Sequence, residues 1–149
     1  MRKLAIAIVL LIGLHGSARA ESIGLGVFLG QPTGLDIKIG LQGRSALDIV
    51  LGATRFDEPR ASYGHLQYLV LLGVARGQSI NVPFRLGIGV AVAGLTEDNT
   101  ALFARVPLQI GLRFRRTPLE IYGEIAFVLQ LIDDVDTDVD GGIGIRVYF

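Results

Sequence analysis

Apolar and polar residues alternate along most of this chain with a period of two. Near the carboxyl end, for example, Ile143, Ile145, Val147 and Phe149 are apolar, and a glycine, an arginine and a tyrosine separate them. Successive side chains of a β-strand point to opposite faces, so this period indicates strands with one apolar face and one mixed face. The dominant pattern therefore predicts an all-β protein.

Eight segments carry this pattern, and stretches rich in Gly, Pro, Gln and Arg separate them. The predicted strands are Ser22–Leu29, Leu35–Leu41, Ser45–Ala53, Ser62–Leu72, Ile80–Ala93, Ala101–Phe114, Leu119–Ile132 and Val139–Phe149. Most of them approach or exceed the roughly 9–11 residues that a tilted strand needs to cross a bilayer. Their even number and short connections predict an eight-stranded antiparallel up-and-down transmembrane β-barrel.

The composition of the mixed face favours a membrane barrel over a soluble one. This face is rich in Gly and Ala and poor in Lys, Ser and Thr. Glycine weakens a strand that faces water, but small side chains suit the narrow lumen of an eight-stranded barrel. The opposite face is nearly continuous Leu, Ile and Val, as lipid requires. A soluble lipocalin-like barrel is the alternative that alternation alone leaves open.

The first 20 residues have the features of an export signal. Arg2 and Lys3 are basic, Leu4–Leu14 is an apolar run too short to span a bilayer as a helix, and Ala18-Arg19-Ala20 is a small-residue cleavage box. We therefore expect residues 1–20 to be a cleaved signal peptide and residues 21–149 to form one outer-membrane β-barrel domain. The expected location is the outer membrane of a Gram-negative-type bacterium, reached by secretion through the inner membrane.

Charge is distributed unevenly between the connections. The turns expected on the periplasmic side carry four arginines and no acid, whereas the connections expected outside, 30–34, 54–61, 94–100 and 133–138, carry eight acidic residues against two arginines. The periplasmic arginines are Arg44, Arg76, Arg115 and Arg116, and the outer acids are Asp57, Glu58, Glu97, Asp98, Asp133, Asp134, Asp136 and Asp138. This distribution favours a structural or surface-binding role through acidic outer loops, with outer-membrane lipid and lipopolysaccharide as partners.

The composition excludes several other classes of protein. The chain has no Cys, which excludes disulfides, thiol catalysis and thiolate metal sites. Cleavage after residue 20 would remove three of the 14 basic residues and none of the 14 acidic ones. An acidic mature chain without a basic patch predicts no nucleic-acid partner. No cofactor is implied, and we expect a monomer.

Ten charged residues fall on the mixed face of the predicted strands. They are Asp36, Lys38, Asp48, Arg85, Arg105, Arg113, Glu120, Glu124, Asp140 and Arg146. Five positive charges thus meet five negative ones in a narrow tube, where each charge has to be paired and hydrogen-bonded. Balanced charge favours a lumen plugged by a salt-bridge network over a selective pore, whose lining favours one sign. A narrow solute channel is retained as an alternative.

Signals for catalysis and metal binding are weak. His65 is the one histidine after the expected signal peptide, and the nearest serine, Ser62, is three residues away and thus on the opposite strand face. Without a lipid-facing Ser–His pair we expect no catalytic residues, and a lipid-modifying enzyme is a second alternative. His65 is expected to be a hydrogen-bonded structural residue of the lumen. Asp134, Asp136 and Asp138 form a weak candidate for a divalent-ion contact, and no other metal site is expected.

The closing segment resembles the signal that the outer-membrane assembly machinery reads. Gly144, Val147 and Phe149 take positions of that signal, although Gly142 stands where a polar residue is usual. This resemblance implies the assembly machinery as a partner.

The chain from residue 21 onward also resembles a family of small uncharacterised bacterial outer-membrane β-barrels. The stretches that carry the resemblance are Gly30–Lys38, Val82–Gly89, Arg105–Pro107 and Asp140–Phe149. The architecture is similar to that of the transmembrane domain of outer-membrane protein A, without a periplasmic domain after the barrel. The resemblance implies this fold and no catalytic residues.

Deletion of Phe149 tests the assembly signal. We expect the deletion to lower the amount of protein in the outer membrane and to increase its degradation in the periplasm, because the last strand both closes the barrel and carries the signal. Quantitative immunoblots of outer-membrane and periplasmic fractions measure this effect. Normal outer-membrane abundance after the deletion would contradict the prediction.

Overall fold

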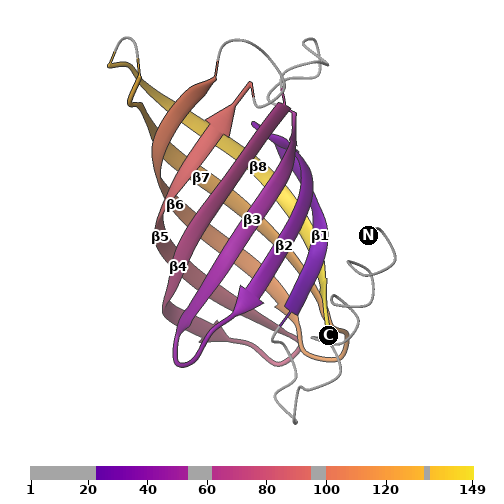
Figure 1. Ribbon diagram of the computed structural model, residues 1–149. Helices are drawn as coiled ribbons and strands as arrows, with labels where there is room; N and C mark the ends of the chain where they lie inside the picture. Colours follow the sequence, from indigo (N-terminus) through magenta and orange to yellow (C-terminus); the bar gives the residue numbers. More distant parts are fainter. Residues whose placement is uncertain (1–22, 54–61, 95–99, 133–134) are drawn as a thin grey trace.

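The protein is a closed barrel of eight antiparallel strands (Figure 1). The computed structural model describes residues 23–53, 62–94, 100–132 and 135–149. The strands are β1 (Ile23–Gly30), β2 (Thr33–Gly40), β3 (Ser45–Ala53), β4 (Ser62–Arg76), β5 (Ile80–Ala93), β6 (Ala101–Phe114), β7 (Leu119–Gln130) and β8 (Thr137–Tyr148). The prediction of an all-β, eight-stranded, up-and-down barrel is confirmed. Within the described ranges, no helix has the length and apolar character needed to cross a membrane.

Pairing between the first and last strands closes the sheet. The β1–β8 ladder runs from the pair Gly24 and Tyr148 to the pair Gly30 and Gly142. The amide of Phe149 extends it by donating a hydrogen bond to the carbonyl of Ile23 at 2.9 Å. All other pairs join strands that are adjacent in sequence, so hairpin connections are sufficient to link them. Closure thus pairs both sides of every strand and removes the exposed edge that an open sheet would present.

The strand boundaries agree with the predicted ones to within two residues, except at the carboxyl end of β4. Strands β3, β5 and β6 begin and end at the predicted residues, but β4 continues past the predicted Leu72 to Arg76. A β-bulge between Leu71 and Gly73 leaves Leu72 without a partner residue in β5 and lets pairing with β5 continue to Arg76. The prediction therefore ended this strand four residues too early, and only residues 77–79 connect β4 to β5. Strand β8 begins at Thr137, which places Asp138 in a strand rather than in a connection.

The two ends of the barrel differ in the length of their connections. The short-turn end carries the connections 41–44, 77–79 and 115–118 together with the carboxyl terminus (Figure 1). The long-connection end carries 31–32, 54–61, 94–100 and 131–136. The predicted signal peptide and six of the predicted outer acids, Asp57, Glu58, Glu97, Asp98, Asp133 and Asp134, lie outside the described residues.

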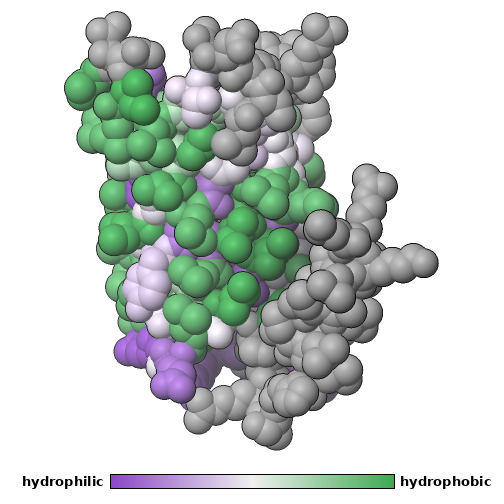
Figure 2. All heavy atoms as spheres, viewed as in Figure 1, coloured by the Kyte–Doolittle hydropathy of each residue, from purple (hydrophilic) through white to green (hydrophobic). Residues whose placement is uncertain are grey.

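Side chains alternate between an apolar outer surface and a largely polar interior. On β5, for example, Phe84, Leu86 and Ile88 are exposed, whereas Arg85 is buried. Figure 2 shows the apolar side chains covering much of the outer wall in view. Among the described residues, the buried apolar cluster of the interior is small and consists of Phe28, Val50 and Tyr122. Polar and charged side chains therefore make up most of what fills the lumen.

Gly144 allows the Tyr122 ring to lie flat across the neighbouring strand. The two residues are direct partners in the β7–β8 ladder, and a Cβ atom on Gly144 would collide with the Tyr122 ring. The Tyr122 ring also stacks on Phe28 with ring centroids 5.9 Å apart. Gly144 thus has a packing role in the folded barrel, and its role in the assembly signal stays a separate prediction.

We expect Gly144→Ala to lower the free energy of unfolding by about 1–3 kcal/mol, because an added methyl group must displace a buried ring. Gly123→Ala is the matched control, since nothing lies within 4 Å of a Cβ atom built on this exposed glycine of the same sheet. Urea unfolding of the refolded protein in micelles, followed by circular dichroism, measures both variants without the assembly machinery. Equal stabilities of the two variants would contradict the packing role.

Candidate functional site

The polar side chains in the lumen form the candidate functional site. In the part of the chain that the structure describes, twelve polar or charged residues are buried, namely Asp36, Lys38, Asp48, His65, Gln67, Arg85, Arg105, Gln109, Arg113, Glu120, Glu124 and Arg146. The structure places nine of the ten charged residues predicted for the lumen in this buried set, and the tenth, Asp140, is half-buried. They gather in three clusters along the barrel axis, which we name the upper, central and mouth clusters.

The upper cluster lies towards the long-connection end and consists of Tyr63, Arg105, Glu124 and Asp140. Arg105 is only 2 % exposed and is its centre. One guanidinium nitrogen lies 2.6 Å from a Glu124 carboxylate oxygen, and another lies 3.2 Å from Asp140. The same guanidinium donates a hydrogen bond of 2.8 Å to the Tyr63 hydroxyl. Arg105 therefore joins strands β4, β6, β7 and β8 in one layer of the lumen.

Two glutamine amides connect the upper cluster to the central one. The Nε2 atoms of Gln67 and Gln109 each donate to Asp48, at 2.9 Å in both cases. The same nitrogens donate to Glu124 at 2.7 and 2.6 Å. Each amide thus holds two carboxylates that would otherwise repel one another across a short distance. The amides supply the donors that make the close approach of Asp48 and Glu124 tolerable.

The central cluster consists of Asp36, Asp48, Tyr122 and Arg146. Arg146 is 0 % exposed, and its guanidinium lies 3.0 Å from Asp36 and 3.6 Å from Asp48. The guanidinium carbon lies 3.7 Å from the centroid of the Tyr122 ring, a cation–π contact. The Tyr122 hydroxyl donates a hydrogen bond of 2.6 Å to Asp36. These contacts join β7 and β8 to β2 and β3, so side chains block the lumen at this level.

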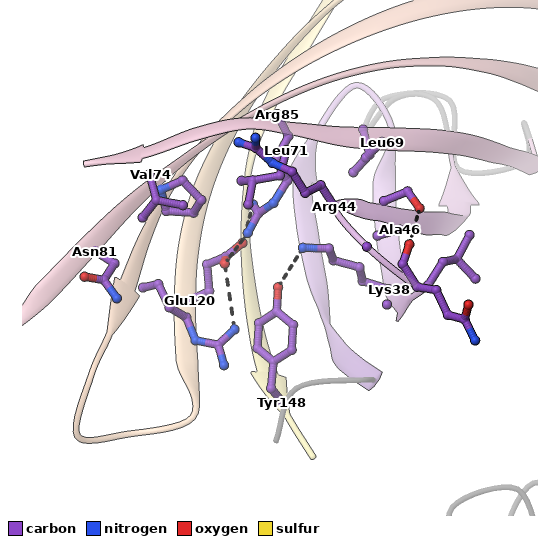
Figure 3. Close-up of a pocket in the computed structure, with 17 residues that line it drawn as sticks. Lys38, Arg44, Ala46, Leu69, Leu71, Val74, Asn81, Arg85, Glu120 and Tyr148 are labelled. Atoms are coloured by element: carbon purple, nitrogen blue, oxygen red, sulfur yellow. Dashed lines mark hydrogen bonds and ion pairs between the residues drawn. The ribbon is translucent and has the colours of Figure 1, made fainter. Parts of the chain in front are cut away.

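The mouth cluster lies at the short-turn end and consists of Lys38, Arg85, Arg113, Glu120 and Tyr148 (Figure 3). Arg85 forms a bidentate pair with Glu120 through two hydrogen bonds of 2.8 Å. Arg113 lies 3.9 Å from Glu120, and its guanidinium carbon is 3.6 Å from the centroid of the Tyr148 ring. Lys38 donates a hydrogen bond of 3.1 Å to the Tyr148 hydroxyl. This cluster therefore contains three cations and one carboxylate.

Several residues of the three clusters were missing from the predicted network. Gln67, Gln109, Tyr63, Tyr122 and Tyr148 provide most of the neutral partners of the buried charges. The same period of two that placed the charges in the lumen also places these five residues there. This period is therefore the sequence signal that could have added them to the predicted network. Which charge each would meet depends on distances across the lumen, and these are not encoded by alternation along one strand.

His65 corrects one prediction made from the sequence. Its side chain faces the lumen and is 3 % exposed, as expected for an inward residue of β4. Its ring packs edge-on against Tyr63, with centroids 5.8 Å apart. Neither ring nitrogen has a hydrogen-bond partner among the described residues. For these residues, the prediction that His65 is hydrogen-bonded was wrong. The T-shaped contact with Tyr63 is a favourable packing arrangement for a buried aromatic pair.

The acidic residues proposed as a divalent-ion contact are only partly described. Asp134 lies outside the described residues, whereas Asp136 and Asp138 are exposed. The carboxylate oxygens of Asp136 and Asp138 each accept a hydrogen bond of 2.8 Å from the backbone amide of the following residue. Within the described ranges, no group of three or more His, Cys, Asp or Glu side chains is arranged to hold a metal ion. Phe149, also predicted as part of the assembly signal, is exposed at the short-turn end.

Neither a protein-family model nor a curated protein nor a solved structure matches this chain. Its class is therefore defined by its own fold and lumen. It is an eight-stranded closed antiparallel β-barrel with an ion-paired, polar interior.

Glu124→Ala tests the contribution of the network to stability. The substitution removes the closest carboxylate partner of Arg105 and one of the two acceptors of each glutamine amide in a buried layer, so we expect a loss of about 3–5 kcal/mol in the free energy of unfolding. Asp136→Ala is the control, because this carboxylate is exposed and accepts a hydrogen bond from the neighbouring Thr137 amide rather than from a buried group. Denaturant unfolding in micelles, followed by circular dichroism, compares the two variants. Small and equal losses would show that the lumen is hydrated and its charges independent.

Proposed function

We propose that this protein is an integral outer-membrane β-barrel whose lumen is plugged by its ion-pair network and whose role is structural or surface-binding. The observation that carries the proposal is the apolar outer wall of a barrel whose interior is charged. A soluble barrel normally has the reverse arrangement, with apolar side chains inside and polar ones outside. An apolar outer wall around a polar lumen is the arrangement of membrane-spanning barrels.

The exposed apolar side chains come from all eight strands. They include Leu25, Val27, Leu35, Leu51, Leu66, Val70, Leu86, Ile88, Val106, Leu108, Ile125, Phe127, Ile143 and Ile145. Soluble monomers rarely expose a contiguous apolar patch of more than a few hundred Å². A surface of this kind is stable only when something apolar covers it, and a bilayer covers a cylinder on every side. Secretion and the outer membrane as the location are supported by the sequence of residues 1–20.

The contacts inside the barrel support a plug rather than a channel. Arg146, Gln109 and Glu120 are each 0 % exposed, so water has no access to them at their levels of the lumen. The bonds that hold these side chains join strands on different sides of the lumen, such as Tyr122 of β7 to Asp36 of β2. An open pore would leave its lining exposed to water along the axis.

The exposed acids of the long-connection end support the surface-binding role. Asp136 and Asp138 are exposed there, while arginines such as Arg44 and Arg115 lie at the opposite end. Short turns face the periplasm in outer-membrane barrels, so the acidic end would face outward. Carboxylates at that position can share divalent cations with the phosphates of lipopolysaccharide.

A combined biochemical and electrical experiment tests this function. We expect a β-rich circular-dichroism spectrum, a heat-dependent shift in gel mobility, a need for detergent, and near-zero conductance in planar bilayers. Fractionation of the source cells should place the protein in the outer membrane. A monodisperse sample without detergent would contradict the membrane location. Steady, ion-selective single-channel currents would contradict the plug and support the channel alternative.

A further inference from the structure

The short-turn end of the barrel contains a pocket that the plug does not require. It has a volume of about 530 Å³ and extends from the 41–44 connection to the mouth cluster (Figure 3). Lys38, which lines it, is the cross-strand partner of Asp48 in the central cluster, so the plugged part of the lumen begins directly beyond the pocket. The pocket is therefore a recess rather than a passage. Its size lies within the range of small-ligand sites, roughly 300–1,000 Å³.

The two buried arginines that line the pocket are stabilised by groups of the barrel itself. Arg85 forms a bidentate pair with Glu120 through two hydrogen bonds of 2.8 Å. Arg113 lies 3.9 Å from the same carboxylate, and its guanidinium carbon lies 3.6 Å from the centroid of the Tyr148 ring. Both arginines therefore have their partners without any ligand.

Lys38 is bound differently from these arginines. The residue is 7 % exposed, and its ammonium donates a hydrogen bond of 3.1 Å to the Tyr148 hydroxyl (Figure 3). Across the described residues, no carboxylate lies within 4.0 Å of this ammonium. Asp48, opposite Lys38 on β3, lies 3.6 Å from Arg146 and accepts hydrogen bonds from two glutamine amides. Burial of an ammonium whose acceptor is neutral is costly, and an anion that enters the pocket reduces that cost.

Lys38 and Tyr148 together offer more hydrogen-bond donors than the described residues use. An ammonium has three donor hydrogens, and a phenol has one. The bond between the two side chains uses one hydrogen of Lys38, and the hydroxyl hydrogen of Tyr148 has no acceptor among the described residues. Both side chains line the pocket, and their donor atoms are 3.1 Å apart. This spacing allows each of them to donate to one oxygen of the same carboxylate.

An apolar surface from β4 and β5 also lines the pocket. It consists of Leu69, Leu71, Val74 and Pro83. The β-bulge of β4 contributes to this surface, because it shifts the alternation so that both Leu71 and Val74 reach the pocket. A ligand with one charged group and a compact apolar body would contact both the donor pair and this surface.

We propose that this pocket binds a small soluble monocarboxylate, whose carboxylate accepts hydrogen bonds from Lys38 and Tyr148 and whose apolar body lies against Leu69 and Leu71. One negative charge matches Lys38, the single buried cation of the described residues that has no carboxylate within 4.0 Å. The site lies inside the ring of strands, which separates it from lipid around the barrel and favours a soluble acid over a fatty acid. This binding function is additional to the plug and does not rest on the membrane location.

Isothermal titration calorimetry of the purified protein tests the site directly. The protein is held in dodecyl maltoside at neutral pH and low ionic strength, and the probes are benzoate, acetate and the neutral analogue benzamide. We expect one-to-one binding of benzoate, weaker binding of acetate because it has no ring to contact the apolar surface, and no binding of benzamide. Absence of benzoate binding at about 10 mM, where a weak small-ligand site is still detected, would overturn the proposal. Equal binding of benzoate and benzamide, or of benzoate and acetate, would overturn it as well.

Two variants distinguish the pocket from general attraction to a basic end. Lys38→Met keeps an unbranched side chain and should weaken benzoate binding by about tenfold or more, because a charge-assisted hydrogen bond is lost. Arg76→Met is the matched control, since Arg76 is an exposed cation at the same end that does not line the pocket, and its affinity should be unchanged. Equal weakening in both variants, or no weakening in Lys38→Met, would overturn the site. Circular dichroism verifies that each variant is folded.

Reductive methylation of the unmodified protein gives an answer that does not depend on folding of the variants. The chain contains two lysines, Lys3 and Lys38, so peptide mass spectrometry assigns methylation to Lys38 unambiguously. We expect formaldehyde with a borane reductant to methylate Lys38 slowly through the pocket, benzoate to slow this reaction, and benzamide to leave its rate unchanged. A Lys38 side chain that stays unmethylated without ligand, or equal rates with benzoate and benzamide, would overturn the proposal.

Micelles that contain oleate separate the two sources of a carboxylate, a soluble acid and a fatty acid. We expect oleate to leave the methylation of Lys38 unchanged, because the strands separate the pocket from the acyl chains around the barrel. Protection of Lys38 by oleate as strong as that by benzoate would overturn the assignment to a soluble ligand.

Discussion

The narrow lumen of a closed eight-stranded barrel is the constraint on which the rest of this structure depends. Every second side chain of every strand points into a space that side chains can just fill. Charged groups placed there lose their hydration and are stable only where an opposite charge or a hydrogen-bond partner meets them. Arg105 and Arg146 satisfy this requirement by each contacting two carboxylates. The same constraint makes Gly144 necessary, because the Tyr122 ring occupies the volume that a side chain would need.

Pairing in the lumen is balanced in sum but uneven along the axis. The upper and central clusters each contain one arginine and two carboxylates, whereas the mouth cluster contains three cations and one carboxylate. Exposed residues continue the same polarity, with Arg115 at the short-turn end and Asp136 at the other. Since the interior is poorly screened, such a separation of charge acts over a longer range than it would in water. The two ends of the barrel therefore differ in charge, with an excess of cations towards the short-turn end and of carboxylates towards the other.

The fold and the inward set of residues could be predicted because both follow from local alternation. A period of two assigns each residue to one of two faces, and turn residues mark where the chain reverses. Lys38, Glu124 and Arg146 were placed in the lumen in this way, without knowledge of any contact. Prediction failed where the alternation is interrupted. The bulge after Leu71 reverses which faces of the sheet the last residues of β4 point to. From the sequence alone, Gly73 is as compatible with a turn as with a bulge, because the difference depends on pairing with the neighbouring strand.

The sequence by itself determined an all-β chain, its eight strands, and which charges face inward. Only the tertiary structure decided which of these charges meet. Glu124 and Gln67 lie on strands that are not neighbours, and their 2.7 Å contact exists because closure of the sheet brings β4 and β7 together across the lumen. The excess of cations in the mouth cluster was hidden for the same reason, since the ten charged residues predicted for the lumen sum to five of each sign. The face to which a side chain points depends on one strand, whereas its position along and across the lumen depends on how all eight strands are arranged.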